Sequence, residues 1–282
     1  MSSNSNLQTV IITGASSGIG KATCLYLAVK GYNVIGTTRK FSRLEGLNTE
    51  AKRLGVSVHG LELDINSDTE VQRIMAEITE KFGRVYALVN NAGYGVWGPV
   101  QNIMIDDFRK LLETNLFAAI RMTQAVLPQM IKSRSGKIIN ISSVLGKIAT
   151  PFNGCYASSK FALEGLSESL RIEVSPFNVQ VAIVEPGLFK TDFQRNQLRS
   201  CRSGDVANSY KPFIERYDSQ HRWFDRLASD PVKVSKVIHK IIKSKHPALR
   251  HPVGWEAHAG IMGARLLPGR LFHAMLSRAT MR

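Results

Sequence analysis

The sequence has few cysteines and no long apolar run. Its three cysteines, Cys24, Cys155 and Cys201, are an odd number and lack the close spacing of a zinc site, which argues against a disulfide framework and a metal centre. No stretch approaches the roughly 18 uninterrupted apolar residues that a membrane-spanning helix needs, and residues 1–8 lack the charged start and apolar run of a signal peptide. We therefore expect a soluble, cytoplasmic protein without a metal site.

Acidic residues are also scarce, most of all in the last third of the chain. Residues 1–194 hold 20 Lys and Arg against 16 Asp and Glu, whereas residues 195–282 hold 17 against 6. Such a basic region can attract phosphate, anionic lipid or an acidic protein, or it can simply be a solvated surface. The basic residues are scattered and lack the aromatic or heptad patterns of nucleic-acid-binding modules, so we predict no nucleic-acid partner.

Apolar, β-branched runs alternate with longer stretches of helical period along the first two thirds of the chain. This alternation is typical of successive β-α-β units, whose parallel sheet is covered by helices on both faces. The predicted strands are Thr9–Thr13, Asn33–Thr38, Ser57–Leu63, Val85–Val89, Lys137–Ile141 and Val179–Val184. The predicted helices are Gly18–Lys30, Ser67–Phe82, Ile105–Lys132, Cys155–Ser175 and Val232–Lys243.

The length of 282 residues suits one large α/β domain. We predict a single doubly wound Rossmann domain over 1–282, with a central, mostly parallel sheet of about seven strands. Beyond residue 188 the alternation loosens, and long segments that follow a strand's carboxyl end tend to build the substrate side of such folds. We therefore assign 188–230 as a substrate-binding insertion and 244–282 as a basic, helical C-terminal extension.

A glycine-rich segment follows the first predicted strand and opens the first predicted helix. Its glycines stand where the backbone must turn sharply and approach a pyrophosphate closely. The exposed amides of such a loop and the positive end of the helix attract phosphate. The segment therefore predicts a dinucleotide site. Its residues at the cofactor are Gly14, Ser16, Ser17, Gly18, Ile19 and Gly20.

The end of the second predicted strand carries cations where NAD-binding enzymes carry an acid. Thr38 takes the position of that acid and is followed by Arg39 and Lys40. Two cations suit the 2′-phosphate of NADP(H), whereas no carboxylate stands there to accept a hydrogen bond from the ribose of NAD(H). We predict NADP(H) as the cofactor, with Asp64 accepting a hydrogen bond from the adenine amine.

Tyr156 and Lys160 stand four residues apart in the predicted helix Cys155–Ser175, so both side chains lie on one face. An ammonium beside a phenol favours the phenolate, which lowers the phenol pKa. We therefore expect Tyr156 to exchange protons with an alcohol or ketone near neutral pH. The pair alone is weak evidence, because the same spacing recurs by chance on many helices.

Several short motifs occur in a fixed order over residues 8 to about 192. They are Thr13-Gly-Ala-Ser-Ser-Gly-Ile-Gly20, Asn90-Asn-Ala-Gly93, Asn115, Ser143, Tyr156-x-x-x-Lys160 and Pro186-Gly187. With this set the chain resembles the short-chain dehydrogenase/reductase family. Each motif is modest by itself, but the ordered set is highly specific.

The resemblance implies a catalytic set of Asn115, Ser143, Tyr156 and Lys160. The serine that matches the catalytic one lies thirteen residues before the tyrosine, which selects Ser143 over Ser142. Ser143 would orient the substrate oxygen, and Tyr156 would deliver a proton as hydride reaches the carbonyl carbon. Lys160 would also hold the nicotinamide ribose, and Asn115 would position a water that leads protons to Lys160.

The resemblance also implies further contacts with the cofactor. Asn90 and Gly93 would flank its nicotinamide half, Thr191 would bond the carboxamide, and Leu188 would contact the ring. The cofactor residues outside the glycine-rich segment are then Thr38, Arg39, Lys40, Asp64, Ile65, Asn91, Ala92, Gly93, Tyr156, Lys160, Pro186, Gly187 and Thr191.

The segments 152–156, 160–165 and 250–254 look like the cluster of that family that contains 17-beta-hydroxysteroid and retinol dehydrogenases. This similarity implies NADPH-dependent reduction of a small lipophilic ketone or aldehyde, of steroid, retinoid or fatty-acyl type. The apolar residues that we expect to accompany Ser143 in the substrate pocket are Val96, Trp97, Leu145, Phe152, Phe189 and Phe193. For each of these apolar residues, ordinary packing in the core is an equal alternative.

Two other functions are compatible with parts of the sequence. A reductase of 3-oxoacyl groups on acyl carrier protein would suit a basic surface, yet those reductases usually end soon after the sixth or seventh strand, and this chain continues to Arg282. The second alternative is an NADP-binding scaffold or redox sensor without catalysis. The presence of all four catalytic residue types argues against it.

The tail over 263–278 interleaves Leu, Phe and Met with arginines. A basic amphipathic segment of this kind can rest on an anionic membrane, and peripheral membrane contact would suit a lipophilic substrate. A lid or dimer element that packs its apolar side on the domain is equally consistent. The family resemblance also implies a homodimer or homotetramer, formed through the long helices that bear Asn115 and Tyr156.

Overall fold

The computed structural model describes residues 7–200, 209–217 and 228–281. At its centre lies a seven-stranded parallel sheet in the order β3-β2-β1-β4-β6-β7-β9. The strands are β1 (Thr9–Thr13), β2 (Asn33–Thr38), β3 (His59–Glu62), β4 (Val85–Asn90), β6 (Gly136–Ile141), β7 (Val179–Pro186) and β9 (Arg250–Val253). The chain builds outward from β1 to β3 and then returns to build the other half from β4, so the predicted doubly wound fold is confirmed.

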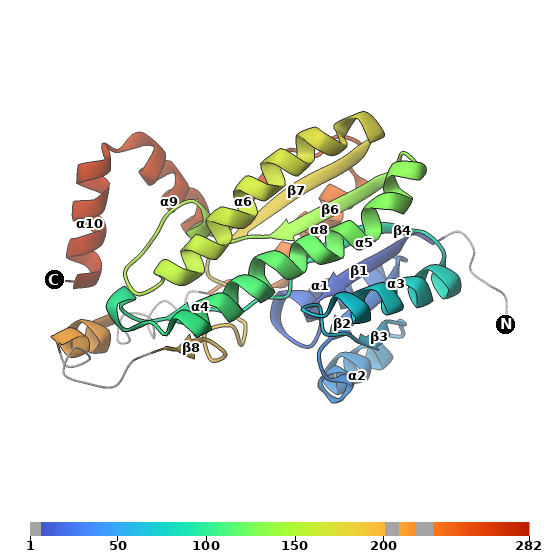
Figure 1. Ribbon diagram of the computed structural model, residues 1–282, viewed down its shortest axis with the longest axis horizontal. Helices are drawn as coiled ribbons and strands as arrows, with labels where there is room; N and C mark the ends of the chain where they lie inside the picture. The colour runs from blue at the N-terminus through green and yellow to red at the C-terminus, as the bar shows by residue number, and fades with distance from the viewer. Residues whose placement is uncertain (1–6, 201–208, 218–227, 282) are drawn as a thin grey trace.

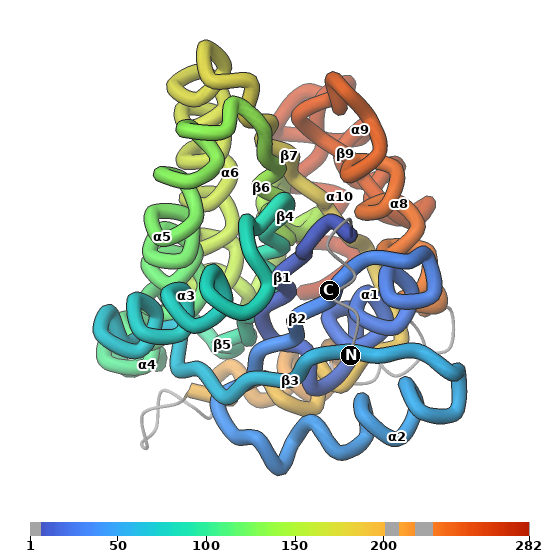
Figure 2. Tube along the Cα trace, turned by 90° about the vertical axis from the view of Figure 1, so that its right-hand side faces the viewer, coloured from blue at the N-terminus to red at the C-terminus, as the bar shows by residue number. Residues whose placement is uncertain are grey.

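Helices cover both faces of this sheet, and Figure 2 shows the two layers on either side of it. One layer consists of α1 (Gly18–Val29), α2 (Glu45–Arg53) and α8 (Val232–Lys243). The other consists of α3 (Asp68–Phe82), α5 (Ala118–Lys132) and α6 (Gly154–Val174). The sheet is therefore buried on both faces, which explains why its central strands read as nearly continuous apolar runs.

Helix α3 illustrates how the sequence sets these elements. Ser67 precedes it, and the Ser67 hydroxyl accepts a hydrogen bond from the backbone N–H of Glu70 at 3.3 Å, which caps the first turn. Val71, Ile74 and Ile78 follow at helical spacing, and all three are buried against the sheet. The cap and the apolar stripe together fix where the helix begins and which face it buries.

The predicted helix Ile105–Lys132 is not one regular helix. It consists of α4 (Ile105–Leu112), a wider π-helical turn (Glu113–Phe117) and α5. A π turn inserts one extra residue into a helix and often marks a functional position. Here it contains Asn115, the residue that the family resemblance placed in the catalytic set.

The C-terminal segment is largely helical, as predicted, and it also contributes one strand to the sheet. It adds β9 as the edge strand, where Pro252 is tolerated because an edge strand leaves one side unpaired. Two helices follow, α9 (Trp255–Leu266) and α10 (Gly269–Met281). Figure 1 shows them at the end of the molecule opposite α2 and α3. Among the described residues, no helix has the length and apolarity needed to cross a bilayer.

A small aromatic cluster joins the region after β4 to the later chain. Trp97, in the short strand β5 (Val96–Trp97), packs against Phe152 and Tyr217 with ring centroids 5.3 and 5.5 Å away. Met281 of α10 packs against the same cluster. Strand β5 also pairs with β8 (Leu198–Arg199). These contacts hold the segments after β7 over one end of the sheet.

Candidate active site

A cavity of about 940 Å³ lies at the carboxyl ends of the parallel strands, where the strand order reverses between β1 and β4. Residues that follow six of these strands line it together. They are Gly14 after β1, Arg39 after β2, Leu63 after β3, Asn91 after β4, Ser142 after β6 and Gly187 after β7. Open α/β sheets bind their ligands at this kind of switch point.

The glycine-rich segment forms one wall of the cavity. Gly14, Ser16, Ser17, Gly18 and Ile19 line it, and Gly14 and Gly18 have φ angles of +69° and +53°, which favour glycine. Their loop opens helix α1, so backbone amides and the positive helix end face the cavity.

Gly20, by contrast, lies behind the cavity wall. A Cβ atom at Gly20 would stand 2.2 Å from the carbonyl oxygen of Gly14. The glycine therefore allows helix α1 to approach the loop, and its role is close packing rather than lining.

Hydrogen bonds between two side chains and the backbone tie the turn after β4 to this loop. Thr13 Oγ1 accepts from the backbone N–H groups of Asn91 and Ala92, both at 3.0 Å. Asn91 Nδ2 donates to the carbonyl oxygens of Thr13 and Gly14 at 2.8 and 3.2 Å. The three residues Asn91, Ala92 and Gly93 line the cavity. Two walls of the cavity are thus fixed to each other by hydrogen bonds between the Thr13 and Asn91 side chains and the main chain.

Asn90 does not line the cavity. It is buried in the sheet, and its Nδ2 donates to Asn140 Oδ1 at 2.9 Å and to Thr123 Oγ1 at 3.3 Å. Its place is between β4, β6 and α5, so Asn90 connects these elements and is set back from the nicotinamide position that the resemblance implied.

Cations stand at the end of β2, and the sequence identified only some of them. Thr38 and Arg39 line the cavity, and Arg43 adds a second guanidinium from the following helical turn (Phe41–Leu44). Lys40 is exposed and lies outside the cavity wall. No carboxylate from β2 or that turn lines the cavity.

Asp64 is also outside the wall. Its Oδ1 accepts from the backbone N–H of Asn66 at 3.0 Å, and this contact shapes the turn after β3. The neighbours Leu63, Ile65 and Asn66 line the cavity instead. Ile65 thus lines the cavity as a cofactor residue would, and Asn66 is the polar neighbour that lines it in place of Asp64.

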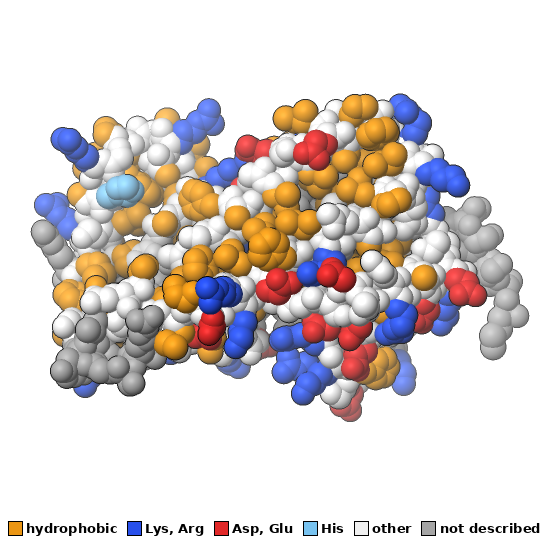
Figure 3. Space-filling model, viewed as in Figure 1, with side chains coloured by type: hydrophobic (Ala, Val, Ile, Leu, Met, Phe, Trp, Pro, Cys, Tyr) orange, Lys and Arg blue, Asp and Glu red, His pale blue; other side chains and the backbone are white. Residues whose placement is uncertain are grey.

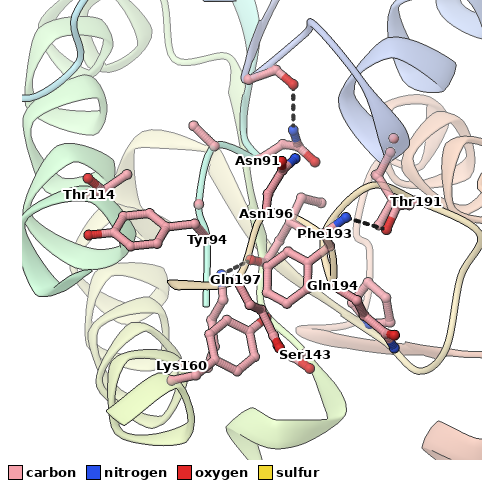
Figure 4. Close-up of a pocket in the computed structure, with 18 of the residues that line it drawn as sticks. Asn91, Tyr94, Thr114, Ser143, Lys160, Thr191, Phe193, Gln194, Asn196 and Gln197 are labelled. Carbon is pink, nitrogen blue, oxygen red and sulfur yellow. Dashed lines mark hydrogen bonds between the residues drawn. The ribbon is translucent and has the colours of Figure 1, made fainter. Parts of the chain in front are cut away.

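Ser143, Tyr156 and Lys160 line the cavity from β6 and α6. The Tyr156 phenol is hydrogen-bonded to the Ser143 side chain, and Ser143 Oγ also accepts from the backbone N–H of Leu145 at 3.1 Å. Lys160 Nζ lies 5.7 Å from the centroid of the Tyr156 ring and donates to the carbonyl oxygen of Ile141 at 2.8 Å. Figure 4 shows Ser143 and Lys160 at the same end of the cavity.

Asn115 lies beneath this group, outside the cavity wall. In the π turn its Nδ2 donates to the Tyr94 carbonyl oxygen at 2.9 Å and to Ser159 Oγ at 3.1 Å, and its Oδ1 accepts from the Tyr94 N–H at 3.1 Å. A Cβ atom at Gly93 would stand 2.9 Å from Asn115 Oδ1. Asn115 therefore fixes the Gly93–Tyr94 turn and ties it to α6.

Burial controls the protonation of the catalytic pair. It raises the pKa of Tyr156 to about 12, and the hydrogen bond from Ser143 only partly opposes it. Burial also lowers the pKa of Lys160 to about 8, against the attraction of Glu164. The expected lowering of the phenol pKa is therefore wrong: desolvation outweighs the nearby ammonium. A phenol that keeps its proton at neutral pH is suited to donate it.

The predicted substrate residues divide into two groups. Leu145, Phe189 and Phe193 line the cavity, and the Phe193 ring centroid lies 5.2 Å from that of Tyr156. Trp97 and Phe152 do not line it. They are buried in the aromatic cluster with Tyr217, and Val96 is buried in a neighbouring core.

Figure 4 shows polar side chains that the sequence did not single out, with the Tyr94 ring directed toward Thr114. Tyr94 directly follows the Asn-Asn-Ala-Gly motif, which was a usable signal. Thr280 comes from the last turn of α10, and nothing in its sequence surroundings marks it. The further polar lining residues are Thr37, Arg43, Asn66, Tyr94, Lys110, Glu113, Thr114, Thr150, Asn153, Gln194, Asn196, Gln197, Tyr217 and Thr280.

A glycine-rich loop at the switch point of a parallel sheet, next to the half-buried Ser143 and the buried Tyr156 and Lys160, defines a dinucleotide-dependent enzyme. The family model described as short chain dehydrogenase matches residues 8–201. The chain therefore belongs to the short-chain dehydrogenase family. It is an oxidoreductase that uses a nicotinamide cofactor, as this family does.

Two curated relatives cover most of the chain. A 3-ketodihydrosphingosine reductase of Bacteroides thetaiotaomicron is 38% identical over 250 residues, covering 88% of this chain and 88% of the relative. Retinol dehydrogenase 8 of Bos taurus is 36% identical over 252 residues, covering 86% of this chain and 80% of the relative. The chain thus lies close to the retinol dehydrogenase-like members of the family.

Solved structures agree with this assignment. A short-chain dehydrogenase from Streptomyces avermitilis superposes with a TM-score of 0.80 at 30% identity, covering 97% of this chain and 96% of the other. A metagenomic short-chain oxidoreductase in complex with NADP gives a TM-score of 0.69 at 26% identity, covering 87% and 96%.

Proposed function

We propose that this enzyme reduces a small lipophilic ketone or aldehyde with NADPH, with Tyr156 as the proton donor. The observation that carries the proposal is the single cavity in which Ser143, Tyr156, the glycine-rich loop and two arginines meet. Its contents fit the cofactor: backbone amides for the pyrophosphate, and Arg39 and Arg43 for a 2′-phosphate.

Each side chain has a separate task in this reaction. NADPH held at this site would supply the hydride for the carbonyl carbon, which would leave negative charge growing on the substrate oxygen. The Ser143 hydroxyl holds that oxygen, and the Tyr156 phenol gives it a proton. Lys160 holds the cofactor ribose and favours release of the phenol proton. Asn115 keeps the turn at Gly93 and Tyr94 in place and positions the water that leads protons to Lys160.

The preference for NADP(H) over NAD(H) rests on charge at the end of β2. Arg39 and Arg43 line the cavity there, and no carboxylate from the same segment faces them. A ribose hydroxyl of NAD(H) would meet two guanidinium groups and no carboxylate from this segment, whereas a 2′-phosphate would be held by both. The NADP in the metagenomic neighbour is consistent with this choice.

A lipophilic substrate suits the part of the cavity beyond Tyr156. Leu145, Phe189 and Phe193 provide apolar and aromatic surface there. The two curated relatives are named as a 3-ketodihydrosphingosine reductase and a retinol dehydrogenase, which supports a lipophilic class. We infer that segment 188–230 forms the substrate side of one domain over 1–282 and that 244–282 covers it; residues 201–208 and 218–227 lie outside the described structure.

The test is a steady-state assay of the purified enzyme with a panel of steroid, retinoid and long-chain ketones and aldehydes. NADPH and NADH are compared with each substrate, and a 3-oxoacyl group on acyl carrier protein is included. We expect turnover of free lipophilic carbonyls with NADPH. Turnover confined to the carrier-bound group, or NADPH binding without any turnover, would contradict the proposal.

We also propose that the α9–α10 pair rests on an anionic membrane surface. Exposed Trp255, Leu266 and Leu271 stand beside arginines such as Arg265 and Arg270 on these helices. A cytoplasmic enzyme with peripheral membrane contact would thereby receive its substrate from the bilayer.

Sedimentation with vesicles tests this surface. Phosphatidylcholine vesicles with and without phosphatidylglycerol are used, and L266E/L271E is compared with V29E. Val29 is similarly exposed but lies on α1. We expect only the double variant to lose binding to the anionic vesicles; equal binding of all three proteins would remove this surface from consideration.

A homodimer through the α4–α6 face is our proposal for the assembly. Figure 3 shows hydrophobic side chains gathered over these helices, and Ile105, Phe117, Phe161 and Ile172 are among the exposed ones. Light scattering coupled to size exclusion tests it: F117E/F161E should give the monomer mass. An unchanged oligomer in that variant would assign the assembly to another face.

A further inference from the structure

A buried pair of acids lies directly behind the catalytic lysine. Tyr156, Lys160 and Glu164 follow one another at four-residue spacing on α6, so they share one face of the helix. Glu164 is 3% exposed, and Glu185, on the neighbouring strand β7, is 1% exposed. Neither acid lines the cavity. Two acids at this depth require an explanation, because isolated buried charges are costly.

Two cations hold one side of Glu164. Lys147 Nζ and Arg250 Nε each lie 3.0 Å from Glu164 Oε2. Arg250 also pairs with the exposed Glu168, and its Nε lies 3.5 Å from Glu185 Oε1. These surroundings suit one ionised carboxylate at Glu164.

The two acids are not fully satisfied by these cations. Glu164 Oε1 is buried without a hydrogen-bond partner, and Glu185 Oε1 is buried with only the 3.5 Å contact to Arg250 Nε. Both carboxyls thus lie around the same Arg250 Nε, and since two ionised carboxylates cannot donate to one another, a proton between them would supply the missing donor. Burial and repulsion from Glu164 raise the pKa of Glu185 to about 7, against the attraction of Lys147 and Arg250.

The end of β6 connects this pair to the active site. The carbonyl oxygen of Ile141 accepts from Lys160 Nζ at 2.8 Å. The next residue, Ser142, donates its backbone N–H to the Val184 carbonyl at 2.8 Å, one residue before Glu185. The acid that α9 contributes to this region, Glu256, lies against Gly187 and Gly254. The charges that face the pair thus come from α6, β9 and the turn at Lys147.

We propose that Glu164 and Glu185 share one proton and act as positioning residues for Lys160. When that proton leaves to solvent, the pair carries two negative charges and stabilises the Lys160 ammonium more strongly. The charge of Glu164 already favours the ammonium and raises the Lys160 pKa against burial. Loss of the shared proton adds a second negative charge behind Lys160, so the ammonium persists to higher pH. Only the catalytic task of Lys160 in this inference rests on the proposed function; the shared proton does not.

The first test is thermal unfolding as a function of pH, which needs no substrate. The folded pKa of Glu185 lies above its ordinary value of 4.5, so its protonated form contributes stability that is lost as the pH rises through about 7. E185Q mimics the protonated acid, and we expect it to lose less of its melting temperature than the wild type between about pH 5 and pH 8.

E168Q is the matched control. Glu168 is exposed, lies on the same helix as Glu164 and pairs with the same Arg250. It should keep the wild-type dependence of melting temperature on pH. If the melting temperatures of the wild type and E185Q changed in parallel with pH, the proposal of a shared proton would be wrong.

The second test is the pH profile of kcat for NADPH-dependent reduction. At about pH 6 E185Q should match the wild type, whereas its alkaline limb should move to lower pH by on the order of half a unit, because the second negative charge is missing. An unmoved limb would overturn the role of the pair at Lys160. Absence of turnover in the wild type would instead count against the proposed function. The unfolding curves would still show whether Glu164 and Glu185 share a proton.

A spectroscopic measurement covers the case in which E185Q fails to fold. The carbon-13 resonances of the glutamate carboxyls in the wild type are followed with pH, in parallel with E168Q. One glutamate should titrate near pH 7 in both proteins. If every glutamate titrates in the ordinary acidic range, the shared proton does not exist.

Discussion

The cofactor side and the substrate side of the cavity are built in different ways. On the cofactor side, strand ends meet through main-chain contacts: a Cβ atom at Gly14 would stand 2.9 Å from the Ala92 Cα atom. On the substrate side, Phe193, Tyr217 and Thr280 come from separate segments after β7 and meet through side chains. The first side tolerates almost no change in shape, whereas the second can change its lining without disturbing the sheet.

The comparison predicts the largest effect where the two sides meet, at Tyr156. Y156F removes the only proton donor on the phenol but keeps the ring that packs on Phe193. We expect kcat to fall by about 10²- to 10⁴-fold while NADPH affinity stays close to the wild type. Stopped-flow reduction and NADPH fluorescence titration measure the two quantities. Y86F, a change on β4 outside the cavity wall, serves as the control; wild-type turnover in Y156F would contradict the assignment.

The next effect concerns the rigid side, at Gly20. G20A places a Cβ atom 2.2 Å from the Gly14 carbonyl oxygen, so the loop must shift. We expect a loss of about 1–3 kcal/mol in the free energy of unfolding and weaker NADPH binding.

G165A is the matched control for G20A, because nothing lies within 4 Å of a Cβ atom at Gly165 in α6. It should stabilise the protein by about 0.5–1 kcal/mol. Chemical denaturation measures both variants. Equal stabilities for the two would show that the cofactor side is less rigid than these contacts indicate.

A smaller effect is expected at Arg39, on the edge of the rigid side. R39A removes one charged hydrogen-bond donor, so the KM for NADPH should rise roughly 10-fold, while the KM for NADH changes little. R53A changes an exposed arginine of α2 outside the cavity wall and should alter neither. A proportional rise for both cofactors would contradict the preference for NADP(H).

The smallest effect should come from the adaptable side. F193A removes a ring that lies over Tyr156 from a segment without regular structure. We expect the KM for the ketone to rise by only a few-fold, with no change in the KM for NADPH or in the melting temperature. F41A, an exposed phenylalanine of the turn after β2, is the control. A large loss of stability in F193A would show that the substrate side is as constrained as the cofactor side.

The sequence predicted the cofactor side well because its constraints are local. A strand, three glycines and a helix follow one another at Thr9–Val29, so their geometry can be inferred without distant contacts. The four-residue spacing of Tyr156 and Lys160 is equally local, and the structure brings both to the cavity with Ser143.

The substrate side could not be predicted in the same way. Trp97 and Phe152 are apolar and close in sequence to the site, yet their packing depends on Tyr217 and Met281. The phenol pKa of Tyr156 was misjudged for a similar reason, since burial depends on the whole fold and not on the neighbouring lysine. Thr280 reaches the cavity only because α10 folds back across it.

The position of Thr280 also affects how the enzyme should be handled. The last turn of α10 forms part of the cavity wall, and Met281 packs against the aromatic cluster. An affinity tag fused after Arg282 would begin two residues from that wall. A peptide added there would compete for the same space as a substrate, so kinetic work is better done with the tag removed.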